Sequence, residues 1–220
     1  MRLTSNQYTS HQNTSLWYDI GMTSELTPAA FTPAAFVKGI IGTDEIVEDT
    51  SRAHVAFIGR SNVGKSSIMN ALLGRKSLVK SSARPGKTTE INLFTVGEGY
   101  YFVDLPGYGF ARLGAKQREK LRRLILWYLV RLEIPRRLVC VVIDAQVGLT
   151  DFDREITEEL EKNNEAVCII ANKTDRLNQK AQVVLKRELD TLNLQYFMVS
   201  AKTSRGIDKI QEYIIETLRT

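Results

Sequence analysis

The sequence predicts an α/β domain: a mostly parallel six-stranded sheet with one antiparallel edge strand and helices on both faces. Three observations lead to this prediction. From residue 54 onward, short apolar runs alternate with amphipathic segments, as in a sheet covered on both faces. A glycine-containing loop joins the first apolar run to the first amphipathic segment. The chain of 220 residues is also long enough for one domain with a full core.

The predicted elements follow one another in a regular order. Strands are expected where apolar residues run together, at 54–59, 90–96, 99–104, 137–144, 166–171 and 195–199. Helices are expected where apolar residues recur at helical spacing, at 65–74, 115–133, 150–163, 178–192 and 206–219. The second and third strands are separated by the sequence GEG and should form a hairpin, which provides the antiparallel edge strand.

The N-terminal region differs from the rest of the chain. Residues 1–35 are expected to form a disordered tail, because the first 30 are rich in Ser, Thr, Asn and Gln and lack periodicity. The domain is then expected at 36–220. Met22 is an alternative start of the protein, and a signal peptide is not expected, because the first 20 residues contain one Arg and no apolar stretch.

Charge and cysteine content limit the class of protein. The net charge is +5, with −3 over residues 1–53 and +8 over the remainder. A basic body fits RNA or another polyanion as a partner, although a solvated basic surface would have the same composition. No apolar run reaches the ~18–20 residues that span a bilayer. Cys140 and Cys168 lie in apolar runs, which is typical of buried, reduced cysteines in a cytoplasmic protein.

The loop GRSNVGKS matches the phosphate-binding pattern G-x-x-x-x-G-K-[ST] between a strand and a helix. Glycine lets backbone N–H groups approach phosphates closely, and the helix start adds further donors. Lys65 would neutralise the β- and γ-phosphates, and Ser66 would offer its hydroxyl to Mg²⁺. A chance turn is the alternative. The nucleotide-binding residues expected here are Gly59, Arg60, Ser61, Asn62, Val63, Gly64, Lys65, Ser66 and Ser67.

Two further segments predict that the base is guanine. The Asp175 carboxylate, in the sequence NKTD after a predicted strand, can accept hydrogen bonds from guanine N1–H and from its exocyclic amine. Adenine has an acceptor at N1 and would be rejected. The sequence SAK after the next strand would bring the Ala201 amide to guanine O6. The residues expected to contact the base or to order these loops are Asn172, Lys173, Asp175, Ser200, Ala201 and Lys202.

The sequence DLPG supplies the groups that would face the γ-phosphate and the metal. Asp104 ends a predicted strand and can hold Mg²⁺ through water, while the Gly107 amide can approach the γ-phosphate. Thr88, rather than the adjacent Thr89, is expected to complete the Mg²⁺ shell with Ser66, from a Gly/Pro/Ser-rich segment suited to a switch loop. Lys65, Thr88 and Gly107 are therefore the candidate catalytic residues.

With these motifs assembled, the chain resembles the EngB family of ribosome-biogenesis GTPases, in the Era-like branch (TrmE-Era-EngA-EngB-septin type) of P-loop GTPases. The segments that carry the resemblance are GRSNVGKSS, RPGKTTEINLF, VDLPGYGFA and the basic helix that follows, within residues 36–220. The resemblance implies a Ras-like fold, binding of GTP, GDP and Mg²⁺, and GTPase activity. It also implies a role in late assembly of the large ribosomal subunit. We expect the protein to be cytoplasmic and monomeric.

Two residues bear on the rate of hydrolysis. Tyr108 stands where many small GTPases have a glutamine that orients the attacking water, so turnover is expected at or below about 10⁻² s⁻¹. Asn62 occupies a position where related GTPases use an asparagine to hold K⁺ beside the phosphates. An asparagine that favours the loop turn explains the residue equally well.

The helix expected at 115–133 is a candidate RNA-binding element. Residues 112–137 contain nine basic and two acidic residues, and Lys116, Lys120 and Arg123 should form an outward stripe that contacts phosphates of the large-subunit rRNA. An ordinary solvated helix face is the alternative. Two other classes stay open: a nucleotide-gated adaptor in cell division or at a membrane that binds no RNA, and a P-loop ATP kinase, which NKTD opposes.

Overall fold

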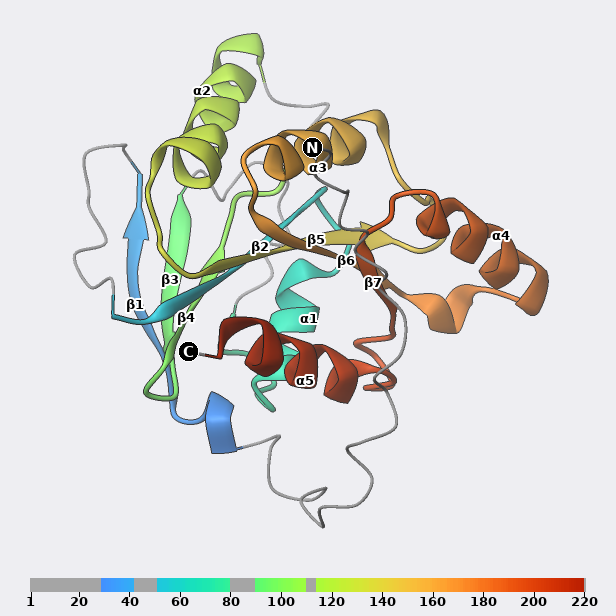
Figure 1. The fold of residues 1–220 in the computed structure, drawn as a ribbon, viewed down its shortest axis with the longest axis horizontal. Coiled ribbons are helices and arrows are strands. Elements are labelled where there is room, and N and C mark those ends of the chain that lie inside the picture. The colour runs from blue at the N-terminus through green and yellow to red at the C-terminus, as the bar shows by residue number, and fades with distance from the viewer. Residues whose placement is uncertain (1–28, 42–50, 80–89, 110–113, 220) are drawn as a thin grey trace, which may run out of the picture.

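The computed structural model describes residues 29–41, 51–79, 90–109 and 114–219. Its core is a seven-stranded sheet with the strand order β1-β3-β4-β2-β5-β6-β7 (Figure 1). The strands are β1 (Ala34–Ile40), β2 (Ala53–Gly59), β3 (Ile91–Val96), β4 (Tyr100–Asp104), β5 (Arg137–Asp144), β6 (Ala166–Asn172) and β7 (Gln195–Met198). The helices are η1 (Ala29–Phe31), α1 (Lys65–Leu72), α2 (Ala115–Leu126), η2 (Trp127–Arg131), α3 (Asp151–Lys162), η3 (Thr174–Arg176), α4 (Gln179–Asp190) and α5 (Ile207–Leu218).

The predicted α/β class is confirmed, and all six predicted strands are present. Strands β4, β2, β5, β6 and β7 pair in parallel, and β3 pairs antiparallel with β4 through the expected hairpin. The number of strands and the edge position need correction. A seventh strand, β1, pairs antiparallel with β3 and takes the edge that β3 was expected to occupy.

The added strand lies partly inside the segment for which a tail is expected. β1 begins at Ala34, and the preceding helix η1 ends at Phe31. The Phe31 side chain is buried, and its ring centroid lies 5.7 Å from that of Tyr100 and 5.6 Å from that of Phe102. The apolar contacts of Phe31 and the pairing with β3 therefore hold residues 29–35 on the domain. Residues 1–28, including Met22, lie outside the described residues.

The helices cover both faces of the sheet because successive residues of its buried strands point to opposite sides. On β5, Val139, Val141 and Ile143 belong to the cluster beneath α2, α3 and α4, while Leu138, Cys140 and Val142 belong to the cluster beneath α1 and α5. Figure 1 shows α1 and α5 on one side of the sheet and α2 and α3 on the other. The predicted burial of both cysteines is confirmed. Cys140 and Cys168 are free thiols that lie opposite each other on the adjacent strands β5 and β6, with their Sγ atoms 3.6 Å apart.

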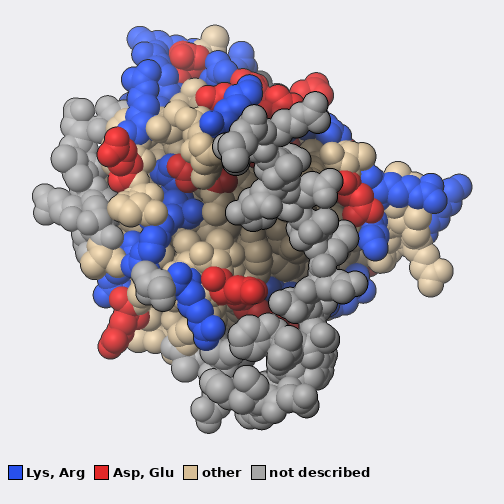
Figure 2. Space-filling view, viewed as in Figure 1, with Lys and Arg blue, Asp and Glu red and all other residues tan. Residues whose placement is uncertain are grey.

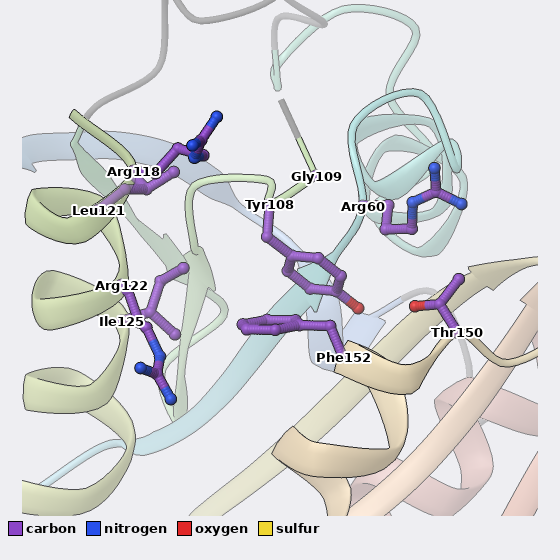
Figure 3. A pocket seen from close by; sticks show the side chains of 9 residues that line it. All are labelled: Arg60, Tyr108, Gly109, Arg118, Leu121, Arg122, Ile125, Thr150 and Phe152. Carbon is purple, nitrogen blue, oxygen red and sulfur yellow. The ribbon is translucent and has the colours of Figure 1, made fainter. Parts of the chain in front are cut away.

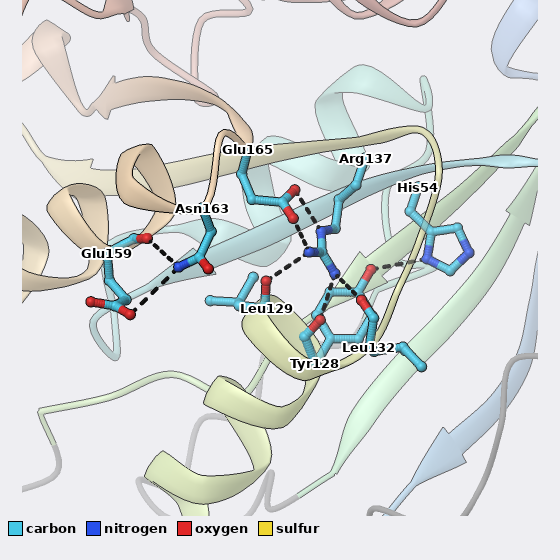
Figure 4. Close-up of polar contacts among 8 residues, drawn as sticks. All are labelled: His54, Tyr128, Leu129, Leu132, Arg137, Glu159, Asn163 and Glu165. Carbon is cyan, nitrogen blue, oxygen red and sulfur yellow. Dashed lines mark hydrogen bonds and ion pairs between the residues drawn. The ribbon is translucent and has the colours of Figure 1, made fainter.

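A buried polar cluster holds the end of α2 at the starts of β2 and β5, where His54 and Arg137 lie (Figure 4). The predicted helix at 115–133 ends as α2 at Leu126 and continues as a π turn, η2. The Arg137 guanidinium donates to the carbonyls of Tyr128, Leu129 and Leu132 and forms an ion pair with Glu165. It thereby satisfies C-terminal carbonyls that would otherwise lack partners.

Candidate functional site

The phosphate loop joins β2 to α1 in a conformation that requires glycine at two positions. A Cβ at Gly59 would collide with the Val142 carbonyl oxygen of β5. Gly64 has φ of +94°, and a Cβ there would collide with the Asn172 amide. Asn62 also has positive φ, +68°, a conformation that asparagine tolerates better than most residues. The tight turn thus brings the loop backbone against the start of α1.

Lys65 and Asp104 meet beside this loop. Lys65 is the first residue of α1, and its ammonium forms an ion pair with the carboxylate of Asp104, which ends β4 and is 4% exposed. Ser66 follows in the first turn of α1. These three groups suit a phosphate chain with bound Mg²⁺. The lysine is positive and complements the phosphates, whereas the serine hydroxyl and the buried carboxylate offer oxygen atoms to the metal.

The segment after β4 runs along the phosphate loop. The Ser61 N–H donates to the Tyr108 carbonyl at 3.0 Å, and the Tyr108 N–H donates to the Gly59 carbonyl at 3.3 Å. Gly107 lies close enough that a Cβ there would be 3.2 Å from Ser61 Oγ. The Gly107 backbone therefore lies at the edge of the phosphate loop, where the sequence predicts that it faces the γ-phosphate.

The Tyr108 side chain points away from the phosphate loop toward α3. Figure 3 shows the ring beside that of Phe152, and the two ring centroids are 4.4 Å apart. The Tyr108 hydroxyl donates to Asp153. Tyr108 is 7% exposed. Its phenol is thus engaged by groups within the protein.

Asn172 connects the phosphate loop to the two loops of the predicted guanine site. This residue ends β6 and is 2% exposed. Its Nδ2 donates to the Val63 carbonyl at 3.0 Å, and its Oδ1 accepts from the Ala201 N–H at 3.0 Å. The predicted link between Asn172 and the phosphate loop is thus present as a hydrogen bond. The second hydrogen bond links Asn172 to the loop after β7 as well.

Asp175 is held in place by the loop after β7. The Ser200 hydroxyl donates to Asp175 Oδ1 at 2.6 Å, and this hydrogen bond lowers the pKa of the Asp175 carboxyl below its ordinary value. Asp175 is exposed and ionised near neutral pH, so its carboxylate can accept hydrogen bonds from a base. Ala201 and the exposed Lys202 flank it on the same loop.

The structure brings most of the predicted site residues together and adds one. The Lys173 ammonium lies 2.5 Å from the Asn62 carbonyl oxygen and 2.7 Å from Asp144 Oδ2. Asp144 was not predicted, although its place at the end of β5, between two strands that carry site residues, is the signal that could have found it. Thr88 and Thr89 lie outside the described residues.

The predicted basic stripe is exposed. Lys116, Lys120 and Arg123 all lie on the solvent side of α2, while Leu121, Leu124 and Ile125 are buried on the opposite side. Figure 2 shows Lys and Arg side chains gathered over α2. Arg123 also forms an ion pair with Glu119, at 3.4 Å one turn away on the same helix. Among the described residues, no helix is long and apolar enough to cross a membrane.

A phosphate loop after the first parallel strand, with an NKTD loop hydrogen-bonded to it, defines a P-loop GTP-binding protein. Comparison with known proteins places the chain more closely. A family model described as 50S ribosome-binding GTPase (MMR_HSR1) matches residues 54–173. The "Probable GTP-binding protein EngB" of Porphyromonas gingivalis is 40% identical over 189 residues, which cover 82% of this chain and 92% of that protein.

Further relatives agree. The protein of the same name from Roseobacter denitrificans is 44% identical over 145 residues, 66% of each chain. The chain therefore belongs to the EngB family of GTP-binding proteins. A crystal structure of a "probable GTP-binding protein engB" matches 76% of this chain and 99% of its own with a TM-score of 0.64 at 24% identity. One of Era with MgGDPNP and part of 16S rRNA has a TM-score of 0.60 at 22% identity, over 77% of this chain and 58% of its own. These two structures support the fold.

Proposed function

We propose that this protein is a GTP-dependent molecular switch that hydrolyses GTP slowly and acts in assembly of the large ribosomal subunit. The observation that carries the proposal is the direct hydrogen bonding among three loops at one edge of the sheet. Asn172 joins the phosphate loop to the loop after β7, and Tyr108 joins it to the segment after β4. Membership of the EngB family and of the 50S ribosome-binding GTPases supports the ribosomal role.

In this proposal the phosphate loop and α1 bind the triphosphate. Lys65 leaves Asp104 to contact the β- and γ-phosphates, and the Gly107 N–H donates to the γ-phosphate. Ser66 and Thr88 would hold Mg²⁺ directly and Asp104 through water. Bound there, the metal would neutralise charge on the β- and γ-phosphate oxygens. Asp175 selects guanine, and the Ala201 amide donates to its O6.

Hydrolysis is an in-line attack by water on the γ-phosphorus, with cleavage of the bond to the β–γ bridging oxygen to give GDP and phosphate. The Tyr108 phenol is occupied by Asp153 and does not hold the water. The intrinsic rate is therefore low, and a partner or K⁺ near Asn62 raises it. Loss of the γ-phosphate removes the group that Gly107 binds and releases the segments around Gly107 and Thr88, which changes how the adjoining helix α2 is presented.

The partner in this proposal is rRNA of the large-subunit precursor, contacted by the exposed stripe of Lys116, Lys120 and Arg123. Each side chain places a positive charge where phosphates can reach it. The protein acts as a cytoplasmic monomer. If it binds nucleotide normally and never associates with ribosomal particles, the adaptor alternative replaces this one.

The nucleotide part is tested by calorimetry with GTP, GDP and ATP. The natural protein should prefer both guanine nucleotides to ATP by at least about a hundredfold. Lys65→Ala should abolish the binding of GTP. The exposed Lys209→Ala on α5 is the matched control and should bind as the natural protein does. Equal affinity for ATP and GTP would overturn the proposal.

The ribosomal part is tested by sedimentation with large ribosomal subunits in the presence of a non-hydrolysable GTP analogue or GDP. Charge reversal at Lys116, Lys120 and Arg123 should weaken association. The matched control reverses three exposed basic residues of α4, namely Lys180, Lys186 and Arg187. Equal losses in the two triple variants would point to a nonspecific charge effect and contradict the assignment to α2. Equal GTPase rates in KCl and NaCl would exclude the K⁺ role of Asn62.

A further inference from the structure

Tyr108 is attached to the rest of the protein on three sides. Its backbone exchanges hydrogen bonds with Gly59 and Ser61 of the phosphate loop, and the Ser61 hydroxyl also donates to its carbonyl at 3.3 Å. Its ring packs on Phe152, and its hydroxyl donates to Asp153, both in α3. The residue next to Gly107 is therefore bound to the phosphate loop and to a helix that carries none of the nucleotide-binding motifs.

Asp153 uses both carboxylate oxygens. Oδ1 accepts from the Tyr108 hydroxyl, and Oδ2 accepts from Thr150, from its N–H at 2.8 Å and its hydroxyl at 2.6 Å. The side chain is 1% exposed. The Thr150 bonds cap the first turn of α3 and explain why an acidic residue stands there. They do not explain why Tyr108, 45 positions earlier in the chain, reaches the same carboxylate.

We propose that Tyr108 and Asp153 are positioning residues for the GTP-bound state, holding the Gly107 amide at the phosphate loop and thereby strengthening the binding of GTP relative to that of GDP. This inference rests on the proposed function. The backbone bonds of Tyr108 with Gly59 and Ser61 keep Gly107 beside the phosphate loop, and the side-chain contacts with Asp153 and Phe152 hold Tyr108 in the position that makes these bonds. This positioning should increase the affinity for GTP and not that for GDP, because only GTP has the γ-phosphate to which the Gly107 amide would donate.

A space lies beside Tyr108, into which its ring would turn if the contact with Asp153 were released. A cavity of about 260 Å³ lies between α2 and α3, and the Tyr108 ring forms one wall with Phe152, opposite Leu121 and Ile125 (Figure 3). The ring can turn into this space when its hydroxyl releases Asp153. It would then contact α2, the helix that carries the proposed RNA-binding stripe.

The charge of Asp153 gives the contact a pH dependence. Burial raises the pKa of its carboxyl to about 6, while the Thr150 N–H, Arg60 of the phosphate loop and Arg154 of α3 act in the opposite direction. Arg154 is itself paired with Glu188 of α4. An ionised carboxylate accepts a hydrogen bond more strongly than a neutral one. The hold on Tyr108 should therefore weaken as the pH falls through 6.

The test compares dissociation constants for GDP and a non-hydrolysable GTP analogue in Tyr108→Phe, Asp153→Asn and the double variant at pH 7.5. We expect each single variant to lose affinity for the GTP analogue by at least about fivefold and to bind GDP nearly as the natural protein does. The double variant should lose no more than either single variant, because both remove one contact. Tyr196→Phe is the matched control: it removes a tyrosine hydroxyl that donates to Asp190 at 2.6 Å, between β7 and α4, and should leave the ratio of the two constants unchanged.

A second measurement follows that ratio from pH 7.5 to 5.5. The nucleotide phosphates also titrate near 6, so the profile of Asp153→Asn serves as the baseline. The natural protein should lose preference for the GTP analogue relative to this baseline as the pH falls. Should Asp153→Asn fail to fold, Tyr108→Phe still decides the question. Normal GDP binding with an unchanged ratio would overturn the inference and leave the proposed function intact, whereas failure of the natural protein to bind GDP would overturn the proposed function.

Discussion

The guanine side and the switch side of the site lie at the same edge of the sheet but are held together differently. On the guanine side, Asn172 bonds to backbone groups of two loops, and Asp175 accepts from the Ser200 hydroxyl. All of these residues belong to the recognised motifs. On the switch side, Tyr108 depends on Asp153, a buried carboxylate of α3 that belongs to none of them.

This difference separates two properties of a nucleotide switch. The groups that hold the guanine side do not change charge near neutral pH, because Asn172 is neutral and the pKa of Asp175 lies below its ordinary value. The switch side includes a carboxyl whose pKa is about 6. Choice of base should thus be constant between pH 5.5 and 7.5, while discrimination of the γ-phosphate should vary.

The largest effect is expected from Asp175→Asn on the guanine side. The amide would present a donor to the exocyclic amine of guanine, so GDP affinity should fall by about a thousandfold. Xanthine has a carbonyl where guanine has that amine, so the variant should prefer xanthosine diphosphate. Calorimetry with both nucleotides checks this, with the exposed Asp208→Asn of α5 as control. Unchanged GDP affinity would remove Asp175 from the site.

Asn172→Ala should have the next largest effect, because it breaks the connection between the phosphate loop and the loop after β7 on the guanine side. The Val63 carbonyl and the Ala201 N–H would both lose a buried partner, at about 1–3 kcal/mol each. GDP affinity should fall about a hundredfold, and the midpoint of thermal unfolding should fall too. Asn163→Ala, at the exposed end of α3, is the control. A loss confined to the GTP analogue would contradict the separation of the two sides.

The sequence predicts the guanine side better than the switch side, for a physical reason. Loops that grip a ligand need particular residues at fixed spacing, and Gly59, Gly64 and Asp175 each leave that local signal. The partner of Tyr108 needs only to be a buried acceptor at the start of a neighbouring helix. Asp153 in sequence looks like an ordinary helix-capping residue, and nothing local points to position 108.

The edge strand β1 and the end of α2 likewise could not be predicted from local sequence. β1 has the sequence AAFVKGI, whose small residues weaken the alternation of apolar and polar side chains that is typical of a strand. Its pairing with β3 also has a register irregularity between Phe36 and Lys38. Pairing with β3 makes it a strand. The apolar spacing of α2 continues past Leu126, so the sequence extends the helix, whereas the structure turns it into η2, whose carbonyls bond to Arg137.

The third prediction concerns stability on the switch side. The pKa of Asp153 in the folded protein is about 6, above its ordinary value of 3.8, so its contribution to stability is full below 3.8 and is lost as the pH rises through 6. Lowering the pH from 7.5 to 4.5 should therefore stabilise the natural protein by about 2 kcal/mol relative to Asp153→Asn. Denaturant unfolding of both proteins measures this. Asp151→Asn, an exposed residue of the same helix turn, should show no such relative change.

The smallest effect is expected from Ser200→Ala, which asks how much the prior placement of Asp175 matters. The hydroxyl donates to Asp175 and orients it, but the carboxylate is exposed and keeps its charge at pH 7 without it. GDP affinity should therefore fall only about fivefold at pH 7. Because Ser200 lowers the pKa of Asp175, the loss should grow as the pH falls to the ordinary value of 3.8, where the variant carboxylate becomes protonated first. Calorimetry at pH 7 and 3.8 separates orientation from charge: an equal loss at both values would assign the whole effect to orientation, and the guanine side would then be held without any contribution from titration.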